Sequence, residues 1–371
     1  MIPVCTPLIG RREAAYVMSC LRDNWISSSG KYLNLFEEKF SAYCGKKYGI
    51  ATTNGTAALH LALAALGVGP GDEVIMPSFT IASTAFATLY CGAKPVLVDS
   101  EPETWNMDAR QIEKKITKRT KIIMPVHIYG NPCAMGAIMQ IAKKHKLYVI
   151  EDAAEAHGAE FNGKRAGGIG DAGCFSFYGN KIITTGEGGM VVTDDKKLAQ
   201  RCRSLKNLSF LKKKRFWHEE IGFNYRMTNI QAALGLAQFE QIETFVKKRR
   251  NNARIYHSLL SGIKGLTLPV ERKGTKNVYW MYGFLVEKSF GMNRGRLMQK
   301  LHEKGIETRT FFFPMHRQPV LKKMGLFARE RYPVAEGISQ KGLYLPSGSG
   351  LKRQEIEYIC DTIRSLTKSS K

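Results

Sequence analysis

The sequence predicts an α/β protein with a mostly parallel central sheet, followed by a smaller α+β domain. Short apolar runs at 73–76, 95–98, 122–126 and 147–150 alternate with helical stretches near 80–90, 108–116 and 135–145. Continuous apolar strands separated by helices are typical of a parallel sheet covered on both faces. Beyond about residue 231 this alternation stops. A chain of 371 residues allows about two domains. We expect a large domain over 1–240, whose N-terminal segment can pack on a small domain over 241–371.

The first elements are helical. The sequence predicts helices over 11–22 and 33–44, with a polar turn at 25–30 between them. Asn54, Gly55 and Thr56 then open an apolar helix that runs to Leu66. Small residues at a helix start leave backbone N–H groups pointing outward, which suits a phosphate. A simple N-cap explains the same three residues equally well.

The stretch from Cys174 to Thr193 contains one lysine between two predicted strands. The first strand covers 174–178, Lys181 follows a Gly-Asn pair, and a glycine-rich turn leads to the second strand at 190–193. A partly desolvated lysine at the rim of a sheet has a lowered pKa and can form a Schiff base. For an isolated lysine the commoner alternative is an exposed loop residue.

Polar residues follow several predicted strands, namely Asp99, His127, Glu151, Asp152 and Ser176. Open α/β sheets bind ligands beyond the carboxyl ends of their strands. Lys181, Asp152 and Ser176, taken with the Gly55–Thr56 helix start, fit pyridoxal phosphate. A buried carboxylate keeps the pyridine nitrogen protonated, and a helix start with a hydroxyl binds the phosphate. For Asp152 considered alone, the favoured alternative is a helix N-cap.

The second part of the chain is less regular. We expect a long helix from Met227 to about Leu260, a strand region around 278–282, a helix near 294–304 and a last helix after 352.

The formal net charge is +24, with basic runs at 212–215 and 247–250. No nucleic-acid-binding motif accompanies these runs, so we expect no nucleic-acid partner. The charge indicates either a lysine-rich surface or a basic mouth for a polyanionic small substrate. The eight cysteines are scattered and predict reduced thiols and no metal site. There is no signal-peptide pattern and no apolar run of the ~20 residues that span a membrane, so we expect a cytoplasmic protein.

Several stretches resemble the DegT/StrS family of nucleotide-sugar aminotransferases, which have the fold type I (aspartate aminotransferase) architecture. The similarity runs from Trp25 to the region of Pro346, and its motifs are at 54–63, 69–75, 126–130, 149–156, the Lys181 block, 222–229, 280–282, 305–309 and 314–316.

The resemblance implies a role for each matching residue. Lys181 would form the Schiff base with pyridoxal 5'-phosphate, and Asp152 would pair with the ring nitrogen. Gly55, Thr56 and Ser176 would hold the phosphate, together with Asn224 from the neighbouring subunit of a homodimer with shared active sites. Glu155 and His157 would lie near the cofactor. The sugar nucleotide would be contacted by His127, Arg309 and His316. For Arg309 and His316, a place on the surface or in the core explains the sequence equally well.

One position departs from the family. Ile81 stands where most members have an aromatic residue stacked on the pyridine ring. Either Ile81 replaces the stack with an apolar contact, or Phe79 or Phe86 approaches the ring.

The resemblance implies transfer of an amino group from L-glutamate to C4 of a nucleotide-linked 4-keto-6-deoxyhexose. The favoured substrate is GDP-4-keto-6-deoxy-D-mannose, which would give GDP-perosamine, and the alternative is a UDP- or dTDP-linked sugar. A catalytically silent regulator that binds the cofactor is a more distant alternative. Relatives that carry histidine in place of the lysine are dehydratases, so Lys181 favours transamination.

Overall fold

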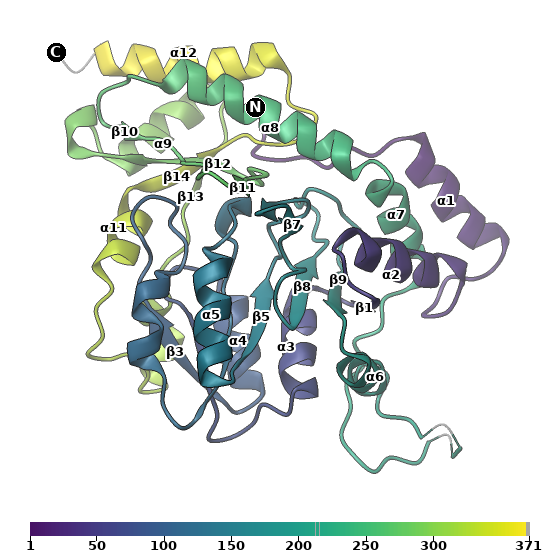
Figure 1. The fold of residues 1–371 in the computed structure, drawn as a ribbon. Helices are drawn as coiled ribbons and strands as arrows, with labels where there is room; N and C mark the ends of the chain where they lie inside the picture. The colour runs from purple at the N-terminus through teal and green to yellow at the C-terminus, as the bar shows by residue number, and fades with distance from the viewer. Residues whose placement is uncertain (212, 215, 369–371) are drawn as a thin grey trace.

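The structure is a computed structural model that describes residues 1–211, 213–214 and 216–368. Lys212 and Arg215, two members of the basic run at 212–215, lie outside the described residues. Figure 1 shows a large layered part built around one sheet, with a smaller part above it that carries the C-terminus.

The central sheet has seven strands, in the spatial order β1 (Tyr48–Thr52), β9 (Gly189–Thr193), β8 (Ala172–Ser176), β5 (Tyr148–Asp152), β4 (Thr120–Ile123), β2 (Glu73–Pro77) and β3 (Lys94–Val98). The five strands from β8 to β3 are parallel. Strand β9 is antiparallel to both of its neighbours. The predicted mostly parallel α/β sheet is therefore confirmed.

Helices cover the sheet on both sides. In the view of Figure 1, α5 (Met135–His145) lies in front of the sheet, with α3 (Gly55–Ala65) and α4 (Ala82–Tyr90) behind it. The helix expected at 108–116 is wrong, because two short 3₁₀ turns, η1 (Ala109–Gln111) and η2 (Glu113–Lys115), stand there. The Asp108 carboxylate accepts the N–H of Arg110, two residues on, which starts a tight turn instead of an α-helix.

Near the β1 edge, α1 (Arg11–Arg22) and α2 (Lys31–Tyr43) pack on α7 (Asn229–Phe239), and α6 (Lys196–Leu205) lies beside β1. The single helix expected over 227–260 is wrong, because α7 ends at Phe239 and α8 (Ile242–Leu260) begins after a bend. At the bend the Gln241 amide donates to the carboxylate of Glu13 and to the carbonyl oxygen of Ala237. These bonds fix the corner against α1.

The C-terminal part has its own antiparallel sheet, in the order β10 (Leu266–Thr267), β12 (Tyr282–Val286), β14 (Gly342–Leu345) and β13 (Arg309–Thr310). Around it lie α8, α9 (Arg294–Glu303), α11 (Pro333–Lys341) and α12 (Arg353–Lys368), and the short α10 (Pro319–Lys323) precedes α11 along the chain. The strand expected at 278–282 starts only at Tyr282. Before it, the Asn277 side chain accepts the N–H of Tyr279, whose φ of 48° turns the chain.

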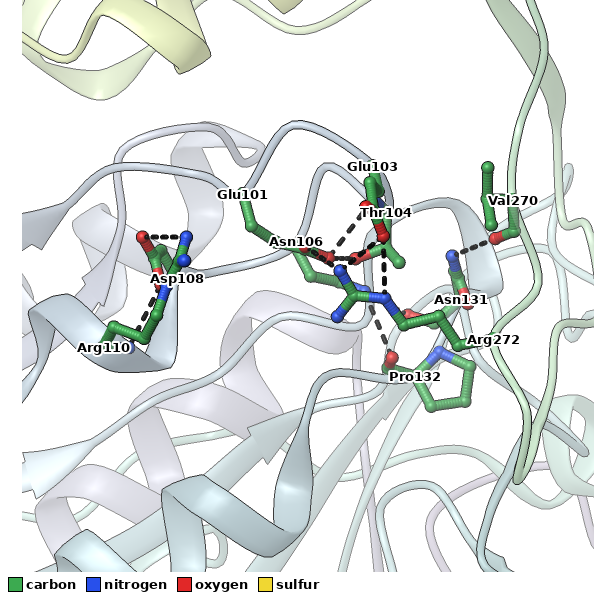
Figure 2. A network of polar contacts seen from close by, with 10 residues as sticks. All are labelled: Glu101, Glu103, Thr104, Asn106, Asp108, Arg110, Asn131, Pro132, Val270 and Arg272. Carbon is green, nitrogen blue, oxygen red and sulfur yellow. Dashed lines mark hydrogen bonds and ion pairs between the residues drawn. The ribbon is translucent and has the colours of Figure 1, made fainter.

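Several contacts join the C-terminal part to the large sheet region. Strand β11 (Thr275–Lys276) pairs with β6 (Glu160–Phe161), which also pairs with β7 (Lys164–Arg165). At the N-terminus, Ile2 forms a bridge with Ile306. Figure 2 shows a third junction, in which Arg272 forms ion pairs with Glu101 and Glu103. The division at residue 240 stays a prediction, since these contacts join the two parts at three places.

All eight cysteines are free thiols. Among the residues that the structure describes, none of the helices has the length and apolar character needed to cross a membrane, and no cluster of three or more His, Cys, Asp or Glu side chains could hold a metal ion.

Candidate active site

A cavity of about 670 Å³ lies beyond the carboxyl ends of β5 and β8, next to the start of α3. Its lining includes six residues that the sequence predicts at the cofactor, namely Gly55, Thr56, Asp152, Glu155, Ser176 and Lys181. Trp280, Phe312 and Tyr344 from the C-terminal part complete the wall. A larger cavity of about 770 Å³ along α8 contains none of the predicted site residues. The sheet topology thus brings together side chains that lie more than a hundred residues apart.

The start of α3 forms an anion cradle. The Asn54 side chain accepts the N–H of Ala57 at 2.8 Å, so it caps the helix. The remaining N–H groups of the first turn have no intrahelical acceptor. Gly55 faces Ser176 so closely that a Cβ added to Gly55 would lie 2.7 Å from the Cβ of Ser176. The helix start can therefore serve both as a phosphate site and as a capped N-terminus, because Asn54 caps the helix while Gly55 keeps the backbone open to a ligand.

Asp152 is a buried carboxylate at the end of β5, 2% exposed. Its Oδ2 accepts the hydroxyl of Thr84 at 2.9 Å, and its Oδ1 accepts the N–H of Ala154 at 3.2 Å. No cationic side chain among the described residues lies within ion-pair distance of it, and burial raises its pKa. A cationic ring nitrogen is the partner that such a carboxylate lacks.

Lys181 is 9% exposed, so it is not a surface lysine. Its Nζ lies 3.9 Å from Oε1 of Glu155 and 3.7 Å from the centre of the Trp280 ring. Burial lowers the pKa of Lys181, while the charges of Glu155 and Asp152 oppose that shift. Burial raises the pKa of Glu155, whose Oε2 accepts the N–H of Tyr129 at 2.7 Å. A lowered pKa favours the neutral amine, which is the form that acts as a nucleophile or a base.

This set of residues fits pyridoxal phosphate on three counts. The start of α3 suits the phosphate. Asp152 is buried, has no cationic side chain among the described residues within ion-pair distance, and suits the ring nitrogen. The desolvated Lys181 suits the aldehyde. The three groups line one cavity.

Two of the predicted substrate contacts are buried away from this cavity. His127 is fully buried, and its Nε2 lies 3.0 Å from Oε2 of Glu151. The N–H of Cys133 lies 3.1 Å from its Nδ1 and donates to it. His316 is 2% exposed and bonds to Ser78 and Glu336. Both imidazoles support the fold here, and neither lines the cavity.

Three other predicted residues also lie outside the cavity lining. Arg309 is exposed and pairs with Glu307. Asn224 is exposed, and its Oδ1 accepts Nε of Arg226 at 2.9 Å. His157 is fully buried behind the site, neither of its ring nitrogens has a hydrogen-bond partner, and burial lowers its pKa to about 3. Their predicted roles stay predictions.

The sequence did not predict the aromatic side chains that line the cavity. His60, Tyr90, Tyr225, Trp280, Phe312 and Tyr344 line it. Ile81 also lines it and is 41% exposed, whereas Phe79 is buried against Tyr129 and Phe86 is not in the lining. The apolar contact at this point therefore comes from Ile81. For Trp280 a signal existed, since it belongs to one of the matching motifs.

Comparisons with known proteins agree with this geometry. The sequence profile of the DegT/DnrJ/EryC1/StrS aminotransferase family matches residues 7–364. The chain is 45% identical to a GDP-perosamine synthase of Caulobacter vibrioides over 359 residues, which cover 96% of each chain. It is 44% identical to a GDP-perosamine synthase of Escherichia coli O157:H7, with 98% of each chain covered. Among solved structures, the PLP form of the putative sugar aminotransferase Spr1654 from Streptococcus pneumoniae superposes with a TM-score of 0.94, at 26% identity, covering 100% of this chain and 99% of that one.

Proposed function

Because this chain belongs to the DegT/DnrJ/EryC1/StrS aminotransferase family, we propose that it transfers an amino group from L-glutamate to C4 of GDP-4-keto-6-deoxy-D-mannose, giving GDP-perosamine. Its cofactor is pyridoxal 5'-phosphate. The observation that carries the proposal is that a desolvated Lys181 and a buried Asp152 line one cavity with the start of α3, and that no cationic side chain among the described residues is within ion-pair distance of Asp152. The choice of guanine nucleotide and sugar is supported by the names of the relatives.

The residues of this chain divide the work as follows. The first-turn N–H groups of α3 and the Ser176 hydroxyl would bind the phosphate. Asp152 would hold a proton on the pyridine nitrogen, because its buried charge gains more from a cation than from water. When bound, the cofactor supplies an aldehyde for the amino group and a ring that withdraws electrons from the neighbouring carbon. Lys181 would hold the aldehyde and would be the amine placed to move a proton at the reacting carbon.

The surroundings of Lys181 suit this second task. Its lowered pKa favours the neutral amine, which is the form that can accept a proton. The Trp280 ring and Glu155 on either side restrict where the amine can lie. Phe312 and Tyr344 help to exclude water from the wall opposite the α3 cradle.

We also infer a homodimer in which each cavity receives Asn224 from the partner. Tyr225 lines the cavity of its own chain, whereas the adjacent Asn224 does not and is exposed. An amide can donate to a phosphate oxygen, and a two-fold dimer would complete both sites in the same way. We further infer a cytoplasmic location from the eight free thiols, since reducing compartments favour that state.

The test is a substrate panel. Purified protein is loaded with pyridoxal phosphate and incubated with L-glutamate and, separately, GDP-, UDP- and dTDP-linked 4-keto-6-deoxy sugars. We expect an amino sugar from the GDP-linked substrate. A product from only the UDP- or dTDP-linked sugars would support the alternative substrate class. A visible cofactor band that does not respond to glutamate would instead indicate a silent regulator.

A further inference from the structure

A buried guanidinium lies behind the active-site lysine. Arg249, on α8, is 2% exposed, and no carboxylate among the described residues is within ion-pair distance of it. Its Nη1 donates to the carbonyl oxygens of Trp280 at 2.5 Å and Ser347 at 3.1 Å, and its Nε donates to the Ser349 hydroxyl at 3.3 Å. A buried cation whose partners are neutral is expensive to desolvate. A merely structural position would be filled at less cost by an apolar or neutral polar residue.

The bonds of Arg249 converge on the peptide just before Lys181. By one route, Arg249 holds the backbone of Trp280, whose indole Nε1 donates to the carbonyl oxygen of Asn180 at 2.9 Å. By the other, its Nη2 donates to Sγ of Cys5 at 3.4 Å, and that thiol donates to the same carbonyl oxygen at 3.5 Å. Two chains of contacts therefore end on one atom, the oxygen of the peptide group that joins Asn180 to the backbone nitrogen of the lysine.

The same tryptophan also contacts the reacting end of the lysine. Its ring centre is 3.7 Å from Nζ of Lys181, and Oε1 of Glu155 is 3.9 Å from the same Nζ. Fixing Trp280 therefore fixes both the backbone and the amine of Lys181. A misplacement of about 1 Å in such an arrangement can cost about 100-fold in rate.

We propose that Arg249 is a positioning residue for the transamination reaction, which acts through Trp280 and Cys5 to fix the Asn180–Lys181 peptide. The proposal rests on the proposed function. The charged and titratable groups that act on Lys181 are Glu155, Asp152 and the Cys5 thiol, which favour its protonated form, and Arg249, which opposes it. The neighbouring His157 stays neutral, since burial lowers its pKa to about 3.

The charge is tested with Arg249→Met and Arg249→Lys. The readout is the pH midpoint of the visible band of bound pyridoxal phosphate, measured without any substrate. Removing a nearby positive charge should raise the midpoint in Arg249→Met, whereas Arg249→Lys should keep it close to that of the wild type. Arg254→Met is the control, because Arg254 is exposed on the same helix and should change nothing. An unchanged midpoint in folded, cofactor-loaded Arg249→Met would overturn the electrostatic role.

The positioning is tested with Trp280→Phe and Cys5→Ala, which remove one route each and keep Arg249. The readouts are kcat and KM for the glutamate half-reaction, followed by the visible spectrum. We expect kcat to fall by about 10-fold or more in Trp280→Phe with little change in KM, and less in Cys5→Ala. If both routes act through Arg249, adding Trp280→Phe to Arg249→Met should cost little more than either change alone.

Fully multiplicative losses in that double variant would refute the proposed route. Should Arg249→Met fail to fold, the Trp280→Phe/Cys5→Ala pair takes its place. Because both routes hold one carbonyl oxygen, the pair should lose more than the product of its single effects, and a simple product would count against the proposal. Wild-type protein without a visible cofactor band would instead contradict the proposed function itself.

Discussion

Replacing Gly55 by alanine tests the phosphate cradle directly. The new Cβ would lie 2.7 Å from the Cβ of Ser176 and 3.2 Å from its Oγ. Carbon atoms in contact are normally about 3.5–4.0 Å apart, so either the α3 start or the β8 end must move by about 1 Å. Overpacking of this kind costs about 1–3 kcal/mol. Since both displaced groups are proposed phosphate ligands, we expect pyridoxal phosphate to bind about 5- to 150-fold more weakly.

The assay is a titration of the apoprotein with pyridoxal phosphate, followed by the visible band, together with the melting temperature of the apoprotein. Alanine within a helix is favoured over glycine by about 1 kcal/mol, which partly offsets the clash in the folding equilibrium but not in cofactor binding. The matched control is Gly69→Ala beyond the other end of α3, where an added Cβ meets no atom within 4 Å. Wild-type affinity in Gly55→Ala would refute the cradle.

Four further results are expected. Asp152→Asn should stay folded and lose activity by orders of magnitude, because the ring nitrogen loses its anionic partner; near-normal turnover would leave Asp152 as a cap alone. Refolding a mixture of Lys181→Ala and Asn224→Asp should restore about a quarter of wild-type activity, since about half of the dimers are mixed and each holds one intact site of two; no recovery with mixed dimers present would exclude shared sites. Added salt should lower kcat/KM and leave kcat unchanged if the charge of +24 steers the substrate, and a flat response would show that it does not. In the folded state burial lowers the pKa of His157 to about 3, whereas in the unfolded chain it is about 6.5, so the free energy of unfolding falls as the pH falls through that window. Between pH 8 and pH 5, the free energy of unfolding of His157→Phe in urea should therefore fall by about 2 kcal/mol less than that of the wild type, and equal losses would contradict the lowered pKa.

Sequence patterns predicted the parallel sheet and the core of the site because both depend on local signals. Apolar runs mark the strands, and the chemistry of Asp152 and Lys181 follows from their places after strands. Patterns of this kind could not show that the 227–260 helix bends, since the bend is fixed by the Gln241 side chain bonding to Glu13, a residue 228 positions earlier. The turn at 277–279 is likewise set by one side chain, Asn277, in a stretch with the composition of a strand.

The histidine predictions show a second limit. His127 follows a strand, as Asp152 does, yet its ring is bonded to Glu151 and Cys133 inside the protein. Position along a strand indicates the edge of the sheet at which a side chain lies, but the bonding partners decide whether it faces a ligand. Arg249 shows the converse, because the spacing of the buried residues of α8 places this arginine on the buried face of the helix. The buried residues are Ile242, Phe245, Val246, Arg249, Asn252, Ala253, Tyr256 and Leu260. A charge on the apolar face of an amphipathic helix was a signal readable in the sequence.

The support of Lys181 also has a consequence for biosynthesis. The Asn180 carbonyl oxygen accepts hydrogen bonds from Cys5, near the start of the chain, and from Trp280, whose own carbonyl oxygen accepts one from Arg249. Arg249 also donates to Ser347 and Ser349. During translation the lysine and the α3 cradle leave the ribosome long before these later segments. All of these contacts are present together only once Ser349 has emerged, so the complete support of the lysine peptide forms late in synthesis.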